Sequence, residues 1–172
     1  MIPKQKRATA QLQPGTWFAL PLPSSGYALG LIARRPASRI PKRIFCYFFG
    51  PRVRCLNDFK VPVVREPDER IFFARTNDRA FKENRWLVLD HIEPFDKNYW
   101  PMPPFRSGAV GGGPNYLRRR YLRTYDDDLR RCESEKLVVV ESLQDYPQDI
   151  SFGHLAMESA VDRVLLGTYQ EH

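Results

Sequence analysis

The sequence has no run of about 18 apolar residues, the length that a helix needs to cross a membrane, so we expect no membrane-spanning segment. Residues 1–15 carry basic side chains but no apolar stretch of the kind found in a secretory signal. Cysteine is scarce: there are three, Cys46, Cys55 and Cys132, and neither their number nor their spacing suits a disulfide framework. Together these absences predict a cytoplasmic protein with reduced thiols.

Recognisable catalytic and metal-binding patterns are also missing. The cysteines and the three histidines are too scattered to supply the short ligand pair of a zinc site. No G-x-S-x-G occurs, and the glycine-rich segment 108–115 lacks the Gly-Lys-Ser/Thr of a phosphate-binding loop. The sequence therefore predicts a protein that is not an enzyme and that has no cofactor, metal site or small-molecule substrate.

Acidic residues are absent from the first third of the chain. Residues 1–57 contain ten lysines or arginines and no acid, whereas residues 141–172 contain six acids and one arginine. The net charge is +7. Such a polarised chain can steer a charged partner toward one of its ends, although the polarity alone does not identify that partner.

Two segments combine cations with aromatic rings. Arg118, Arg119 and Arg120 lie between two tyrosines, and the basic residues around 34–43 precede Tyr47. Phosphate contacts and base stacking use this mixture in nucleic-acid binding, but protein interfaces and solvated surfaces use it as well. We interpret the acidic run 126–128 as a solvated stretch that is neutralised by its neighbours Arg123, Arg130 and Arg131.

What is abundant points to short strands: hydrophobic residues make up 42% of the chain, with 15 prolines and 10 glycines. Segments 17–22 and 27–35 alternate around the turn Pro23-Ser-Ser-Gly26 and predict a hairpin. Apolar residues occupy both faces of 17–22, so both faces should be covered; its prolines predict an edge strand or one that stops early. Gly30 predicts a bulge or a site where an aromatic ring packs against bare backbone. Further strands are predicted at 44–50, 69–77, 85–92 and 136–141.

One helix is predicted, within residues 149–167, because Phe152, Ala156, Ala160 and Val164 recur at a spacing of four. Asp149 or Ser151 would cap its start and Gly167 would end it. The expected fold is α+β and predominantly β: a strongly bent antiparallel sheet or small barrel with a C-terminal helix packed on it. Residues 1–13 are expected to form a flexible tail and residues 14–172 a single domain. Segment 106–125 is expected to be a glycine-rich loop followed by a charged stretch.

Several segments resemble the immunity protein 26 family of bacterial polymorphic toxin systems. The hairpin is similar to the family's opening, in "GTWFALPL" at 15–22 and "GYALGLI" at 26–32, with Thr16 where the family has an acid. Later family strands are similar to "YFFG" at 47–50 and "RWLVL" at 85–89, and the closing helix to "AME" at 156–158. The resemblance covers residues 13–166.

This resemblance implies a cytoplasmic, non-enzymatic protein that binds and neutralises a cognate toxin by protein–protein occlusion. The charged and aromatic loops are the expected contact, because buried aromatic and arginine anchors supply most interface energy. The contact residues that we predict are Arg118, Arg119, Arg120, Tyr121, Arg123, Tyr125, Asp126, Asp127 and Asp128, and then Arg39, Lys42 and Arg43. Trp17, Phe18, Tyr27, Gly30 and Trp86 are assigned to the fold. The alternative is a small β-barrel module that binds nucleic acid through its basic face.

Overall fold

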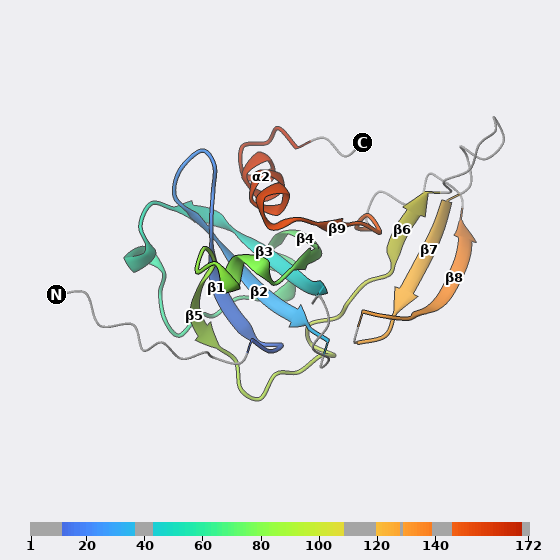
Figure 1. Cartoon of the computed structure of the whole chain (residues 1–172). Coiled ribbons are helices and arrows are strands. Elements are labelled where there is room, and N and C mark those ends of the chain that lie inside the picture. Colours follow the sequence, from blue (N-terminus) through green and yellow to red (C-terminus); the bar gives the residue numbers. More distant parts are fainter. Residues whose placement is uncertain (1–11, 37–42, 109–119, 128, 139–145, 170–172) are drawn as a thin grey trace.

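The structure is a computed structural model that describes residues 12–36, 43–108, 120–127, 129–138 and 146–169 of the 172. Two sheets and a helix dominate it (Figure 1). The larger sheet has the strand order β5-β1-β2-β3-β4-β9, and the smaller one has the order β6-β7-β8. The prediction of a mostly β, α+β fold with a C-terminal helix is confirmed. Of its two alternatives, the described strands form open sheets and no closed barrel.

The large sheet is antiparallel except for the pair β4–β9, which is parallel. Its strands are β1 (Thr16–Pro21), β2 (Tyr27–Arg34), β3 (Arg43–Val53), β4 (Arg70–Asn77), β5 (Leu87–His91) and β9 (Ser151–Phe152). The small sheet contains β6 (Phe105–Gly108), β7 (Arg120–Tyr125) and β8 (Cys132–Val138). The helices are α1 (Arg79–Lys82) and α2 (His154–Leu165), with single 3₁₀ turns η1 (Leu56–Asp58) and η2 (Pro67–Glu69).

The predicted hairpin is formed by β1 and β2. Its turn places Gly26 at a φ of +76°, a conformation that glycine adopts without steric cost, and the Leu22 N–H donates to the Gly26 carbonyl over 3.0 Å. Strand β1 ends at Pro21, as the early-stop alternative predicted, but it lies between β5 and β2 and is therefore not an edge strand.

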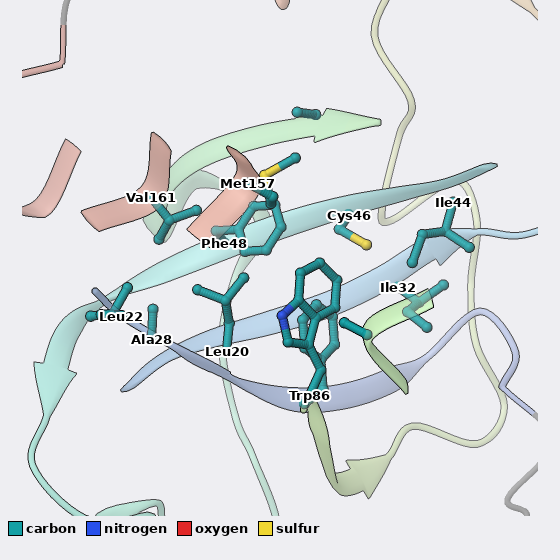
Figure 2. Close-up of a cluster of buried hydrophobic side chains, with 13 residues drawn as sticks. Leu20, Leu22, Ala28, Ile32, Ile44, Cys46, Phe48, Trp86, Met157 and Val161 are labelled. Carbon is teal, nitrogen blue, oxygen red and sulfur yellow. The ribbon is translucent and has the colours of Figure 1, made fainter. Parts of the chain in front are cut away.

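Both faces of the large sheet are covered, as the apolar pattern of β1 predicted. Phe18 points into a core that α2 closes, and its ring stacks on Trp86 with centroids 5.1 Å apart. Figure 2 shows this core, with Met157 and Val161 of α2 facing Phe48 of β3. Trp17 points into the opposite core. Both Trp17 and Phe18 are fully buried.

The second core lies under the segment that leads from β5 to β6. Trp17 meets Trp100 edge-on there, with ring centroids 5.9 Å apart and planes at 85°. Phe105, the first residue of β6, is buried against Phe45 of β3. This core therefore joins the large sheet to the start of the small one.

Gly30 meets an aromatic ring, which confirms the second of the two predictions for it. It lies opposite Phe18 in the β1–β2 register. A Cβ atom added at Gly30 would lie 2.7 Å from Cε1 of Phe18 and closer still to Cζ. The missing side chain thus leaves the space that the Phe18 ring occupies.

Among the described residues, three element boundaries differ from the prediction by three residues or more: the start of α2, the end of β3 and the start of β8. Helix α2 starts only after Gly153, so Asp149 and Ser151 are not its caps, because residues 151–152 pair with β4 as β9. The helix does end before Gly167, at a φ of +68°. Strand β3 runs on to Val53, and β8 begins at Cys132.

Strands β6, β7 and β9, the short helix α1 and the two 3₁₀ turns are elements that the sequence did not predict. Segment 106–125 was expected to be a loop and a charged stretch, but its described residues at both ends pair with each other.

Residue 13 was expected to end a flexible tail. Leu12 packs against the core of Phe18, and the Gln13 carbonyl accepts a hydrogen bond from the Thr16 hydroxyl over 2.8 Å. The division of the chain at residue 14 stays a prediction.

Candidate functional site

The small sheet and the turn after β7 hold most of the predicted contact residues whose side chains are described. These are Tyr121, Arg123, Tyr125, Asp126 and Asp127; Arg43 is exposed at the start of β3. Arg39, Lys42, Arg118, Arg119 and Asp128 lie outside the described residues, and for Arg120 only the backbone, in β7, is described. The structure thus brings five of the twelve together on one element and its turn.

Asp149, which was predicted only as a helix cap, is the centre of the contacts beneath this sheet. Its carboxylate pairs with Arg75 of β4 and accepts a hydrogen bond from Nη1 of Arg123 over 3.1 Å. The Tyr125 hydroxyl donates to the same carboxylate, at 2.8 Å from Oδ2. The side chain of Asp149 is 4% exposed. One buried carboxylate therefore ties β7 of the small sheet to β4 of the large sheet.

The guanidinium of Arg75 lies between two aromatic rings. Its Cζ atom is 4.8 Å from the ring centroid of Phe105 and 4.5 Å from that of Tyr125. Nε and Nη1 of Arg75 are buried and have no hydrogen-bond partner among the described residues, so the ring faces are their main surroundings. Burial, followed by the hydrogen bond to Asp149, raises the pKa of Tyr125 above its usual value. These contacts make Tyr125 and Arg75 parts of the joint between the sheets.

Arg123 also pairs with a residue on the outside of the small sheet. Its Nε donates to Glu135 of β8 over 2.5 Å, and the two residues are direct cross-strand partners. The hydrogen bonds to Glu135 and Asp149 raise the pKa of Arg123. Arg123 was one of three arginines predicted to neutralise the acidic run 126–128. It pairs instead with Glu135 and Asp149.

Asp127 in that acidic run has two other cations as partners. Nε of Arg34 donates to it over 2.7 Å and Nζ of Lys97 over 2.6 Å, and these contacts lower the pKa of its carboxyl. Arg34 is only 5% exposed, and its other nitrogens donate to the carbonyls of Ala33, Trp100 and Lys97. Arg34, the first of the basic residues around 34–43, is thus buried, and it fastens the turn after β7 to the second core.

Asp126 closes the turn itself. Its Oδ1 accepts hydrogen bonds from the backbone N–H groups of Arg130, over 2.9 Å, and Arg131, over 3.3 Å. Leu129, with a φ of 56°, is buried within the second core at this turn. Asp126 thus orders the connection between β7 and β8 through backbone contacts.

Two further buried carboxylates, both on α2, escaped the sequence prediction. Glu158 accepts hydrogen bonds from Nε of Arg85 over 2.6 Å and from Nε1 of Trp86 over 2.9 Å. Asp162, one turn later, accepts from the hydroxyl of Ser24 over 2.6 Å and from Nη2 of Arg52 over 3.0 Å. The sequence did hold a signal for these two buried acids: Glu158 and Asp162 lie on the helix face that also carries core residues. They hold α2 on the large sheet.

Side chains that remain available to a partner line β8. Residues 132–137 are all exposed, and Leu137 is 60% exposed. In the register, Tyr121 of β7 lies beside Leu137, and Arg123 lies beside Glu135. Lys136 has no ion-pair partner among the described residues. The outer strand of the small sheet thus offers an apolar group and a cation at consecutive positions, on opposite faces of the sheet.

A cavity of about 370 Å3 opens on the large sheet, at the end of β3. Its lining is Leu29, Gly50, Pro51, Val53, Asp58, Phe59, Lys60, Val63, Val64 and Arg65. Val64 is 79% exposed, so the cavity carries an apolar rim with charged neighbours. It is a second surface that a partner could contact.

Two further kinds of feature are absent from the described residues: metal-binding side-chain clusters and membrane-spanning helices. No group of three or more histidine, cysteine, aspartate or glutamate side chains suited to a metal ion occurs within the described ranges. Neither described helix has the length and apolar character needed to cross a membrane. Cys46 lies in the core shown in Figure 2, where burial raises the pKa of its thiol well above the usual value.

Comparison with protein families gives a match. The family model described as Immunity protein 26 matches residues 13–115, which include β1 to β6 and most of both cores. Strands β7 and β8 and helix α2 lie beyond the matched region. Curated proteins and solved structures give no match.

Proposed function

The chain belongs to the immunity protein 26 family, and we propose that it binds a cognate bacterial toxin and neutralises it by covering the surface with which the toxin acts. Family membership over residues 13–115 is the observation that carries this proposal. In this proposal the protein works in the cytoplasm, without catalysis, as one member of a polymorphic toxin system.

The architecture agrees with such a role. The second core and the buried carboxylate of Asp149 hold the small sheet in place, so its outer side chains are presented on a rigid support. A rigid binding surface loses less conformational entropy on association than a flexible one does. We propose that the toxin contacts the small sheet and the turn after β7, where Tyr121 and Asp126 are partly exposed and Asp127 is exposed. The predicted contact residues outside the described ranges belong to the same proposal.

The direct test uses the toxin whose gene adjoins the gene of this protein. Co-expression of the two should rescue bacterial growth that the toxin alone arrests. Purified protein should form a stable complex with the toxin in size-exclusion chromatography. An immunity protein of another family, expressed to the same level, is the control. Arrested growth together with separate elution of the two proteins would rule the proposal out.

Nucleic-acid binding is the competing outcome. Among the described arginines, Arg34, Arg75 and Arg123 are engaged by carboxylates of the chain itself, which leaves fewer cations for phosphate. We therefore expect no mobility shift of generic DNA or RNA at about 50 mM salt, where phosphate contacts are strong. A shift that weakens steeply as salt is raised would favour the nucleic-acid function instead.

A further inference from the structure

We propose that strand β8 is completed by a partner strand: an extended segment of the cognate toxin pairs with its free edge and adds a fourth strand to the small sheet. This inference rests on the proposed function and specifies the mode of contact. Main-chain hydrogen bonds to an exposed sheet edge are a general way of capturing an extended segment.

The two edges of the small sheet are treated differently by the chain. The outer edge of β6 is covered by residues 147–149, since the Arg106 N–H donates to the Pro147 carbonyl over 2.8 Å and the Asp149 N–H to the Arg106 carbonyl over 2.7 Å. Strand β8 is the last strand on the other side. No described residue pairs with its outer edge.

Strand β8 carries charged side chains, which are one protection of such an edge, but it lacks the other features that usually protect one. It is seven residues long and contains no proline, and its one register shift lies at its start, opposite Tyr125. From Ser134 to Leu137 the register with β7 is regular. A row of regular backbone positions of this length is enough to align a partner strand.

The charges on β8 argue against a second copy of this chain paired about the middle of the strand. A two-fold axis between two antiparallel β8 strands places the residue at the axis opposite its own copy. The residues on either side of the axis then lie opposite one another. An axis at Glu135 or at Lys136 would bring like charges together, and an axis at Ser134 would bring Glu133 of one copy opposite Glu135 of the other. Like charges directly opposite each other destabilise a strand pair.

The same positions define the chemistry of a foreign strand. Residues that are direct partners point to the same face of a sheet, so a segment in register would place consecutive side chains beside Glu135, Lys136 and Leu137. Lys136, without a described ion-pair partner, favours an acidic side chain. Leu137, with Tyr121 on its other side, favours an apolar one. The expected occupant is an extended toxin segment with an acidic residue next to an apolar residue.

The test follows backbone amide exchange of this protein by NMR, alone and in complex with the toxin encoded by the adjoining gene. Strand pairing should slow the exchange of alternate amides of β8 at least tenfold, because only every second N–H points toward the new strand. Contacts made by side chains alone would leave these amides unchanged. A complex without protection of β8 would overturn this inference and leave the proposed function intact, whereas absence of any complex would overturn both.

Charge variants provide an independent readout. Lys136→Glu should weaken the complex by roughly fivefold, since it puts like charges at a cross-strand position. Lys60→Glu, at the rim of the cavity beside β3, makes the same charge change on another exposed surface and should leave the affinity unchanged. The reverse pattern would place the contact at the cavity and refute the pairing at β8. Chain dimerisation that persists without toxin and protects β8 would refute it as well.

Discussion

The indole Nε1 of Trp86 donates a hydrogen bond to Oε1 of Glu158 over 2.9 Å, although 72 residues separate them in the chain. Trp86 precedes β5 and Glu158 lies on α2, so this contact spans the core that the helix closes. Both residues belong to segments that resemble the immunity protein family, "RWLVL" and "AME". Their role in this structure is to hold the helix on the sheet.

Replacement of Glu158 tests this role. Glu158→Ala removes the buried acceptor of Trp86 and the partner of Arg85, whose side chain is 44% exposed. The free energy of unfolding should fall by about 1–3 kcal/mol, because the buried indole N–H is left without an acceptor. Chemical denaturation followed by circular dichroism measures it. Glu133→Ala, at an exposed position of β8, is the matched control and should change stability by less than about 0.5 kcal/mol. Equal effects of the two substitutions would contradict the assignment.

The contact between Gly30 and Phe18 predicts a specific incompatibility. Gly30→Ala should destabilise the protein by about 1–3 kcal/mol, because the added methyl group overlaps a ring that has no free space to move into. In a Phe18→Leu background the same substitution should cost less, since the smaller side chain yields. Thermal unfolding of the two single variants and the double variant gives the coupling energy. Strict additivity would show that the ring is not the obstacle.

Asp149 is expected to be the most sensitive position at the joint between the sheets. Asp149→Asn keeps the shape but leaves the buried cation of Arg75 without its counter-charge, which should cost about 3–5 kcal/mol. Amide exchange in β6 and β7 should accelerate first, because Asp149 ties β7 to the large sheet. Asp68→Asn, in the exposed turn η2, is the control substitution. Unchanged exchange in β6 and β7 would contradict the role given to Asp149.

Stability should also decline in alkaline solution. Burial is the first cause that raises the pKa values of Cys46, Tyr47 and Tyr125 in the folded protein. Above their ordinary pKa values of 9.0 and 10.0 the unfolded chain releases protons that the folded chain retains, so the free energy of unfolding falls as pH rises. Below about pH 8 these three groups should contribute no pH dependence.

Denaturation curves measured from about pH 8 to 11 would check this expectation. Tyr125→Phe and Cys46→Ala each remove one titrating group and should make the decline less steep. A decline that is equally steep in both variants would exclude these side chains as its cause.

Local patterns were enough to predict the hairpin, most of the large sheet and the end of α2. These patterns depend on residues that are close in the sequence: a hydrophobic period of two, a turn with glycine and a hydrophobic period near four. The structure keeps the elements that they predict. Gly30 shows how far this extends, since an aromatic partner could be inferred, although Phe18 could not be named from the pattern alone.

The small sheet and its anchors could not be predicted in this way. The six residues of β7, "RYLRTY", include a single aliphatic side chain, and they form a strand because β6 and β8 pair with them and Asp149 binds Arg123. The burial of Arg34 could not be predicted, because its acceptor, Asp127, is 93 residues away. Such partners depend on the assembled fold, and no local period reports them.

The two-sided burial of the large sheet has a practical consequence for spectroscopy. The chain has three tryptophans: Trp86 lies in the core under α2, and Trp17 and Trp100 lie in contact in the opposite core. Trp86→Phe would leave fluorescence that comes from one layer alone, and a Trp17→Phe, Trp100→Phe double variant would leave the signal of the other. Each side of the sheet thus carries its own built-in optical probe, and toxin binding could be followed from either side without an added label.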